Sequence, residues 1–300
     1  MKVGIAGIGR MGAAVGERLM SQGHQLVVWN RNPEKAKGVK GAAVAATPAA
    51  LAGECEVVIT LLSDAEAIDS VYRGPEGLLS GKCAGKLFIE MSTVRPEVER
   101  KLAGDVAAKG ARLIECPVGG TTGPAKEGRL LGFVGGEAAD VARAKPLLDQ
   151  MCRRHEHVGA VGAGAAMKLA INLPLLVWYQ ACGEALTLCN QIGLDPARVM
   201  DIFADTSGAP TMLKGRAPRI AGILKGDDPV PTSDVDLARK DLRTMLDEAR
   251  SLGTSLPVTE KVLEIFDRAA KEGWGPRDQA TLPSYWPGRG KAATYQNSKG

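Results

Sequence analysis

The 300-residue sequence predicts an α/β protein with an N-terminal, doubly wound parallel sheet followed by an all-helical domain. Two observations predict this fold class. Short β-rich runs alternate with helical runs as far as about residue 160, and strand signals then stop. A glycine-rich turn near residue 162 precedes one apolar-periodic run over 164–192, roughly 40 Å long if helical. We expect domains over 1–160 and 161–286, joined by this long interdomain helix, and a mobile tail over 287–300.

The strands expected in the first domain are short, and two of them are continuously apolar. Val57-Val58-Ile59 and Leu87-Phe88-Ile89 show no polar alternation, which indicates that helices cover both faces of the sheet. The expected strands are 2–6, 25–30, 56–61, 86–91, 112–116 and 130–134, and the expected helices between them are 11–21, 48–52, 65–72, 96–109 and 138–151. The helices expected in the second domain are 164–192, 197–204, 234–252 and 257–271.

Composition and charge exclude several classes of protein. Apolar residues make up 45% and charged residues 24% of the chain, as in ordinary globular proteins. The net charge of +4 forms no concentrated basic stripe, so we expect no nucleic-acid partner. No apolar run approaches the roughly 20 residues that span a bilayer, and Met1 leads into a strand-like run rather than a signal peptide. We therefore expect a cytoplasmic protein with no membrane partner.

Cysteine and histidine usage gives no sign of a disulfide framework or a metal centre. The six cysteines form no C-x-x-C pair and lie mostly in apolar or helical runs, so we expect reduced, buried thiols. His155 and His157 have no cysteine or carboxylate at ligand spacing, so no metal site is expected. The sequence also lacks a G-x-S-x-G nucleophile elbow and a Walker phosphate loop.

The segment Gly7-Ile8-Gly9-Arg10-Met11-Gly12 follows a predicted strand directly and opens a predicted helix. In a G-x-G-x-x-G turn the first glycine permits the tight turn, the second lets a pyrophosphate approach the backbone, and the third allows close helix–strand packing. A second strand ends at Asn30, at the spacing that a dinucleotide-binding unit requires. The sequence therefore predicts a Rossmann-type nucleotide domain.

The end of that second strand indicates which nicotinamide cofactor is bound. A carboxylate there would bond the ribose 2′-hydroxyl of NAD, whereas an arginine accommodates the 2′-phosphate of NADP. This chain has Asn30-Arg31-Asn32-Pro33, and its first carboxylate is Glu34. We expect Asn30 and Arg31 to contact NADP(H), with NAD(H) as a possible second cofactor. The alternative is a solvated surface Arg31 and dual specificity.

Polar loops follow the next two apolar strands. Leu62-Ser63 and Ser92-Thr93 lie where ligands bind in open α/β sheets, outside the carboxyl ends of strands. We expect Leu62, Ser63 and Thr93 to contact the cofactor. An alternative for Ser92 and Thr93 is helix capping, because Thr93-Val94-Arg95-Pro96 also reads as the start of a helix.

A further glycine loop and one lysine are candidates for substrate chemistry. Val118-Gly119-Gly120-Thr121 follows a strand, and its backbone N–H groups can hold a carboxylate, although a purely structural loop is the alternative. Lys168 and Asn172 lie four residues apart on the long helix, so they share one face. Hydride transfer at a carbinol carbon needs a proton donor or acceptor, which a lysine can be. The alternative for Lys168 is a lysine that snorkels from a buried helix.

Four blocks of sequence resemble the β-hydroxyacid dehydrogenase family, which includes 3-hydroxyisobutyrate dehydrogenases, tartronate semialdehyde reductases and glyoxylate/succinic semialdehyde reductases. The blocks are G-I-G-R-M-G, E-C-P-V-G-G, G-A-G-A-A-M-K-L-A-I-N and Arg239-Lys240-Asp241-Leu242, and the resemblance covers nearly all of residues 1–285. It implies a catalytic Lys168 assisted by Asn172, Gly119 and Gly120 in a substrate loop, and Lys240 at the nicotinamide. It also implies a dimer or tetramer formed through the helical domain.

Three positions depart from the family pattern. Gly119 stands where a serine or threonine is usual, and Ser233 stands where a phenylalanine usually lies seven residues before the lysine of the last block. Pro174 follows shortly after Asn172, where it removes a helix hydrogen bond and favours a kink. The resemblance implies that all three border one pocket, so we expect that pocket to be roomier or more polar than in enzymes for small hydroxy acids.

The sequence thus predicts an NADP(H)-dependent oxidoreductase that interconverts a small β-hydroxy acid and its semialdehyde or oxo acid, with Lys168 as general acid/base. One alternative keeps the fold but takes an imine or amino-alcohol substrate, although imine reductases of similar architecture usually replace the lysine. Another alternative, from a different class, is a non-catalytic cofactor-binding scaffold. Such a scaffold would not need Lys168 beside Asn172.

Overall fold

The computed structural model describes residues 1–189 and 192–287. Of the tail expected over 287–300, residues 288–300 lie outside the described part of the chain. The described chain divides into two compact units, and the second unit begins at Ile171, inside the long helix α8 (Ala163–Cys189). The domain bounds expected from the sequence stay a prediction.

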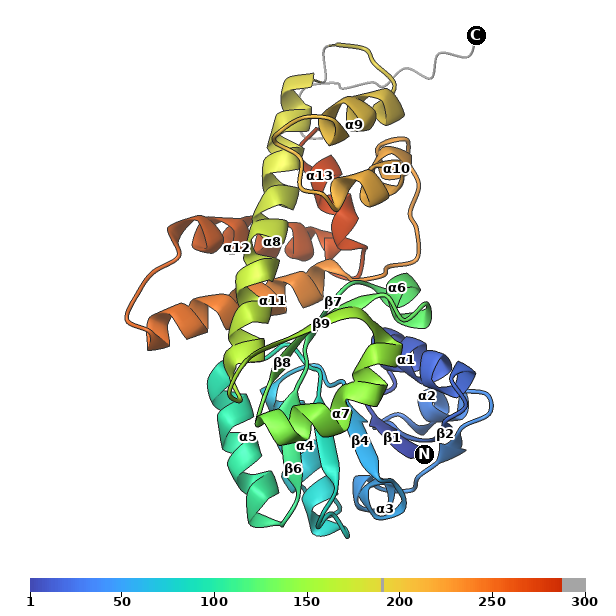
Figure 1. Cartoon of the computed structure of the whole chain (residues 1–300). Helices are drawn as coiled ribbons and strands as arrows, with labels where there is room; N and C mark the ends of the chain where they lie inside the picture. The colour runs from blue at the N-terminus through green and yellow to red at the C-terminus, as the bar shows by residue number, and fades with distance from the viewer. Residues whose placement is uncertain (190–191, 288–300) are drawn as a thin grey trace. The chain divides into compact units, whose positions relative to one another are not determined.

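The first unit is built on one sheet whose strands run mostly parallel (Figure 1). Its strands are β1 (Lys2–Ala6), β2 (Gln25–Trp29), β3 (Ala43–Val44), β4 (Val57–Thr60), β5 (Leu87–Glu90), β6 (Arg112–Glu115), β7 (Val118–Gly119), β8 (Leu130–Gly135) and β9 (Cys152–Gly159). The spatial order is β3-β2-β1-β4-β5-β6-β8-β7, with β9 paired to β8. The chain builds outward from β1 to β3 and then restarts beside β1 with β4, so a topological switch point lies between β1 and β4.

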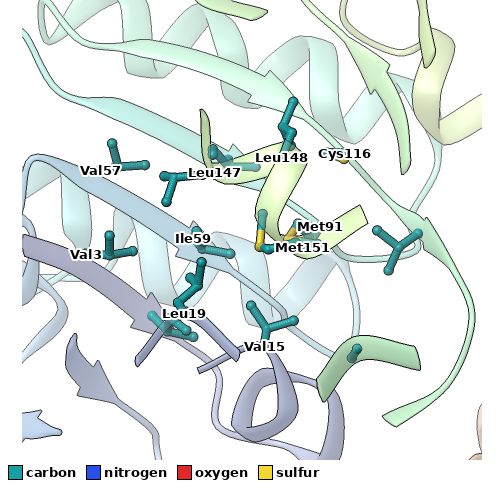
Figure 2. Packing of buried hydrophobic residues seen from close by; sticks show 14 of the residues in the cluster. Val3, Val15, Leu19, Val57, Ile59, Met91, Cys116, Leu147, Leu148 and Met151 are labelled. Carbon is teal, nitrogen blue, oxygen red and sulfur yellow. The ribbon is translucent and has the colours of Figure 1, made fainter. Parts of the chain in front are cut away.

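Helices cover both faces of this sheet, as the continuously apolar strands predict. They are α1 (Arg10–Ser21), α2 (Pro33–Lys37), α3 (Pro48–Glu54), α4 (Ala65–Arg73), α5 (Pro96–Ala108), α6 (Thr122–Lys126) and α7 (Ala138–Met151), with a 3₁₀ turn η1 (Leu78–Ser80). Alternate residues of one strand enter separate cores. Val57 and Ile59 pack with the residues of α1 and α7 shown in Figure 2, whereas Val58 packs with Tyr72 and Phe88 in the other core. The predicted doubly wound fold is confirmed.

The second unit is helical. After the remainder of α8 it contains α9 (Pro196–Ala204), α10 (Leu213–Leu224), α11 (Val235–Ser251), α12 (Pro257–Ala269), the short turns η2 (Ala270–Trp274) and η3 (Gln279–Thr281), and α13 (Leu282–Tyr285). α10 packs on α9 and α13, and α11 packs on α12. α8 continues as one helix through the exposed Pro174, so the proline does not end it. Within the described residues, no helix is long and apolar enough to cross a membrane.

Several elements were not expected from the sequence. The sheet is not wholly parallel, because β8 pairs antiparallel with both β6 and β7. β9 has the sequence C-R-R-H-E-H-V-G, which lacks the apolar pattern of a strand, and it pairs parallel to β8 with register shifts. α10 contains two glycines and Pro218, which are weak helix formers, so its sequence gave no helical signal.

Candidate active site

The three glycines of the loop after β1 differ in what a Cβ at each position would meet. Gly7 has φ +103°, and a Cβ there would lie 2.2 Å from the carbonyl oxygen of Leu61. A Cβ on Gly12 would lie 2.0 Å from the carbonyl oxygen of Gly7, so α1 packs against the loop only when this residue is glycine. A Cβ on Gly9 would meet nothing within 4 Å. Gly9 therefore borders open space, where a ligand can approach the backbone.

The start of α1 fits the pyrophosphate of a dinucleotide. The helix begins at Arg10, and its N-cap residue, Gly9, supplies no side-chain hydrogen bond to the first turn. Backbone N–H groups of the first helical turn and the positive end of the helix dipole together form an anion site. Ile8, which precedes the N-cap, is buried, whereas Arg10 is exposed and Met11 is partly exposed.

Asn30 braces the glycine loop from the end of β2. Its Oδ1 accepts the backbone N–H of Ile8 at 2.9 Å, and its Nδ2 donates to the carbonyl oxygen of Asn32 at 2.9 Å. Asn32 in turn caps α2, since its Oδ1 accepts the N–H of Glu34 at 3.0 Å. Arg31 is exposed between them. The side chain of Asn30 thus links the glycine loop to the backbone just after Arg31. That Asn30 and Arg31 contact the cofactor stays a prediction.

The loops after β4 and β5 are joined to each other. Ser92 is buried, and its Oγ accepts the backbone N–H of Leu62 at 2.8 Å. The hydroxyl of Ser63 donates to Asp64, the N-cap residue of α4. Thr93 lies two residues before Arg95, the residue that occupies the N-cap position of α5, so Thr93 is not the N-cap residue of that helix. The predicted positions Leu62, Ser63 and Thr93 therefore lie on neighbouring loops at the carboxyl edge of the sheet.

Beneath these loops lies a buried carboxyl group, Glu90, at the end of β5. It accepts hydrogen bonds from the hydroxyl of Thr60 and from the backbone N–H of Ser92, the latter at 2.7 Å. Thr60 also lies 2.9 Å from the hydroxyl of Tyr72. Burial outweighs these hydrogen bonds and raises the pKa of Glu90 to about 7. The charge of the neighbouring Glu115 contributes to this rise.

Two further carboxyl groups lie buried beside Glu90. Glu115 is paired with Glu90 across β5 and β6, and it accepts backbone N–H groups from the start of α8. Burial raises the pKa of Glu115 to about 7, while the backbone N–H groups and the charge of Arg100 oppose that rise. Glu99, on α5, is 1% exposed, and neither of its carboxyl oxygens has a hydrogen-bond partner. Burial, with the charges of Glu90 and Glu115, raises the pKa of Glu99 well above its usual range.

This cluster predicts that the protein becomes less stable as the pH rises through neutrality. Between the usual pKa of 4.5 and about 7, the folded chain holds protons at Glu90 and Glu115 that the unfolded chain releases. Stability therefore falls as pH rises across this window. We expect the urea midpoint to be higher at pH 5 than at pH 8 at constant ionic strength. Glu90→Gln, which is neutral at every pH, should weaken the dependence, whereas a midpoint that rises from pH 5 to pH 8 would contradict this prediction.

The predicted substrate loop is short and ordered by the sheet. Val118 and Gly119 form β7 and pair with Gly132 and Leu131 of β8. Gly120 is exposed with φ +125°, a conformation that favours glycine, and Thr121 precedes α6 without capping it through its side chain. The loop follows β6 directly, so it lies at the same sheet edge as the dinucleotide loop.

The lysine and amide predicted for catalysis both lie on α8. Lys168 is partly buried and belongs to the first unit. In the second unit, Asn172 Nδ2 donates to Oδ2 of Asp241 at 3.1 Å, and the ammonium of Lys240 lies 2.7 Å from Oδ1 of the same carboxylate. Asp241 is 9% exposed, so its carboxylate holds Asn172 and Lys240 in a largely buried environment.

Sequence reasoning did not single out three carboxyl groups as site residues: Glu90 and Glu115 in the first unit, and Asp241 in the second. A signal for the two glutamates was present, because each ends a strand with an apolar pair before it, Phe88-Ile89-Glu90 and Leu113-Ile114-Glu115. A carboxylate that ends a buried strand needs partners, which predicts a hydrogen-bonded site. The partner of Asp241 lies 69 residues away along the chain, and no sequence pattern signals that contact.

The two histidines and the cysteines that the sequence analysis considered have no sign of a metal or disulfide role in the described residues. His155 lies 2.8 Å from a carboxylate oxygen of Asp149, and His157 contacts the carbonyl oxygens of Gly136 and Gly159. Across the described ranges, no cluster of histidine, cysteine or acidic side chains has the arrangement of a metal site. The six cysteines, all of which fall in these ranges, are free thiols.

Family models match the chain over both units. A family model for the NAD binding domain of 6-phosphogluconate dehydrogenase matches residues 2–161. A second model, for the NAD-binding region of NADP-dependent 3-hydroxyisobutyrate dehydrogenase, matches residues 162–286.

Individual proteins match along nearly their whole length. Glyoxylate/succinic semialdehyde reductase 1 of Arabidopsis thaliana is 33% identical over 280 residues, which cover 93% of this chain and 96% of that protein. The 3-sulfolactaldehyde reductase of Escherichia coli K12 is 32% identical over 282 residues, covering 93% and 94%. The crystal structure of a 3-hydroxyisobutyrate dehydrogenase from Salmonella typhimurium has a TM-score of 0.83 at 25% identity, covering 95% of this chain and 99% of that one.

Proposed function

The chain belongs to the β-hydroxyacid dehydrogenase family of nicotinamide-dependent oxidoreductases, and we propose that it interconverts a small β-hydroxy acid and its semialdehyde or oxo acid with NADP(H). Its membership of this family was predicted from four sequence blocks and is confirmed. One observation carries the proposed reaction. The start of α8 is hydrogen-bonded to Glu115 at the end of β6, the sheet edge that also carries the dinucleotide loop, and Lys168 lies about one helical turn beyond that start.

The residues of the chain supply binding and proton transfer. When bound, the nicotinamide gives or takes the hydride. In the reduction direction the Lys168 ammonium donates a proton to the substrate's carbonyl oxygen as that oxygen gains negative charge. In the oxidation direction the neutral amine of Lys168 removes the proton of the substrate's hydroxyl group. We assign to Asn172 the role of orienting Lys168; its amide is itself held by a hydrogen bond to Asp241. We assign the carboxylate of the substrate to the glycine loop that contains Val118, Gly119, Gly120 and Thr121.

Preference for NADP(H) follows from Arg31 at the end of β2. The residue is exposed, and no carboxylate lies within residues 30–33 to repel a 2′-phosphate. We expect Arg31→Ala to raise the KM for NADPH about 10- to 100-fold, because charge-assisted hydrogen bonds to a phosphate are lost. The KM for NADH should stay within about twofold.

Steady-state rates at 340 nm with each cofactor measure this preference. Lys40→Ala is the matched control, since it removes an exposed positive charge from the same region but lies beyond α2. If wild-type turnover with NADH equals that with NADPH at equal concentration, the proposed preference is wrong.

A panel of semialdehydes, 2-oxo acids and 3-hydroxy acids, assayed at 340 nm with both cofactors, tests the reaction class. We propose that Gly119, Pro174 and Ser233 widen the substrate pocket or make it more polar. Rapid reduction of glyoxylate or succinic semialdehyde would show that these three departures are neutral. Adding cyclic imines to the panel tests the imine alternative, and cofactor binding without turnover of any compound would favour a scaffold.

We also propose a cofactor domain over 1–160, a helical substrate and oligomerisation domain over 161–286, and a dimer or tetramer formed through the latter. The bounds of the two matching family models support this division. In this assignment Lys240 contacts the nicotinamide from the helical domain. Light scattering of the purified protein gives the oligomer size.

A further inference from the structure

The first turn of α8 is held by a side chain from another element. Glu115, the last residue of β6, is fully buried. Its Oε1 accepts the backbone N–H groups of Gly162 at 2.5 Å and Gly164 at 2.8 Å, and its Oε2 accepts that of Ala165 at 3.3 Å. A helix start leaves its first N–H groups without intrahelical partners. One carboxylate therefore does for α8 what an N-cap side chain usually does from within the helix.

The remaining N–H group of this turn is also satisfied. The backbone N–H of Ala163 donates to the carbonyl oxygen of Ala160 at 3.0 Å. The four N–H groups of residues 162–165 thus all have acceptors, three of them on Glu115. Loss of the carboxylate would leave these donors buried without partners, which is costly.

Glycines surround this carboxylate because no larger residue fits there. A Cβ on Gly135 would lie 2.2 Å from Oε1 of Glu115. A Cβ on Gly164 would lie 2.4 Å from the carbonyl oxygen of Phe133. The glycine-rich turn before the helix therefore serves close packing around Glu115, which fixes where α8 begins relative to the sheet.

The same carboxylate places a negative charge at the positive end of α8. That charge opposes the helix dipole, whose positive end disfavours a nearby ammonium. Lys168 lies four residues beyond Gly164, on the same helical face. The position of the Lys168 backbone and the local potential on its side chain consequently depend on one residue of β6.

We propose that Glu115 is a positioning residue for Lys168: it fixes the first turn of α8 against β6 and supplies the negative charge that keeps Lys168 protonated for reduction. The inference deepens the proposed function and rests on the assignment of proton transfer to Lys168. Glu115 itself contacts backbone N–H groups and touches neither substrate nor cofactor in this role.

The charged groups that face Glu115 set when its own charge is present. Burial disfavours ionisation of Glu115, whereas the backbone N–H groups of the α8 turn and the charge of Arg100 on α5 favour it. Glu90 on β5, Glu99 on α5 and the thiol of Cys116 are the other buried titratable groups nearby. The pKa of Glu115, raised to about 7, means that the carboxylate loses its charge below neutrality. Protonation weakens the charge-assisted hydrogen bonds from Glu115 to the first turn of α8, so we expect an acid limb near pH 7 in the pH–rate profile of the wild-type enzyme.

Glu115→Gln is the central test. We expect the kcat for reduction to fall about tenfold, because the charge-assisted hydrogen bonds that hold the first turn of α8 are weakened. The alkaline limb of the pH–rate profile should move about half a unit to one unit lower, because the charge that favours protonated Lys168 is gone. The acid limb near pH 7 should disappear. The KM for NADPH should stay within about twofold. Glu99→Gln is the matched control. It makes the same change in the same buried cluster, at a carboxyl group with no hydrogen-bond partner among the described residues, and it should keep the wild-type limbs.

A second measurement separates positioning from general destabilisation. In a Lys168→Ala background, Glu115→Gln should lower the residual rate less than twofold, since there is no lysine left to position. An equal, tenfold loss in both backgrounds, or the same limb shift in Glu99→Gln, would overturn the proposal. If Glu115→Gln does not fold, Glu115→Asp replaces it. That variant keeps the charge with a shorter reach, and we expect it to lower kcat while leaving the alkaline limb in place.

The failure of this inference can be told apart from failure of the proposed function. Lysines of wild-type and Glu115→Gln protein are dimethylated with ¹³C-formaldehyde, and the signal of Lys168 is identified by its loss in Lys168→Ala. Its titration midpoint should be about half a unit to one unit lower in Glu115→Gln, whatever reaction the enzyme catalyses. An unchanged midpoint overturns the role of Glu115. Wild-type turnover in Lys168→Ala overturns the proposed function instead.

Discussion

Replacing Lys168 by alanine should lower the turnover number for reduction by about a thousandfold, within the range that a positioned general acid contributes. The dissociation constant for NADPH should stay within about twofold, because the glycine loop and Arg31 are untouched. Stopped-flow or steady-state rates at 340 nm measure the first quantity, and quenching of protein fluorescence measures the second. The melting temperature should change little, since Lys168 is only partly buried.

Two controls make this result specific. Lys101→Ala removes an exposed lysine from α5 and should keep the wild-type rate. Added methylamine or ethylamine should restore part of the lost rate in Lys168→Ala, because a free ammonium can enter the space that the side chain leaves and donate the proton. Retained turnover in Lys168→Ala would mean that another group transfers the proton.

Gly12→Ala should have the second largest effect, on both stability and cofactor affinity. A Cβ at this position would lie 2.0 Å from the carbonyl oxygen of Gly7, so α1 must move away from the loop. We expect a loss of about 3 kcal/mol, which corresponds to a melting temperature lower by roughly 6–12 °C. Affinity for NADPH should fall at least about 100-fold, because the first turn of α1 no longer faces the pyrophosphate.

Gly9→Ala is the informative comparison. Its Cβ would meet nothing within 4 Å, so the melting temperature without cofactor should stay within about 2 °C. NADPH affinity should nevertheless fall, because the methyl group occupies the space through which the pyrophosphate approaches. Equal melting temperatures for Gly12→Ala and the wild-type protein would show that α1 repacks without cost.

The sequence predicted those parts of the fold where apolar periodicity and glycine position carry the information. β1 was predicted at its observed bounds, and the ends of β4, β5 and β6 differ from the predicted ones by no more than one residue. β9 was missed because its pairing with β8 is made through backbone groups, while its side chains are largely charged or polar. β7 has two residues, too few for any alternation to show.

The candidate site was predictable to the extent that its residues belong to motifs. Gly7, Gly9 and Gly12 follow from the geometry of a dinucleotide loop. The hydrogen bonds that hold the site are made across long separations in sequence, such as 47 residues between Glu115 and Gly162. Nor does the sequence show that Asn30 is bonded to the glycine loop, because an amide at that position fits both a ligand contact and a brace.

The buried carboxyl groups also change the electrical charge of the molecule in mildly acidic solution. The formal charge of +4 counts every glutamate as ionised. Near pH 6, Glu90 and Glu115 hold protons in the folded chain, and Glu99 does so to higher pH. The native protein is therefore more cationic than its composition implies, and it should bind a cation exchanger more tightly than its denatured form. Unfolding at that pH releases protons to the buffer, so the measured heat of unfolding depends on the ionisation enthalpy of the buffer.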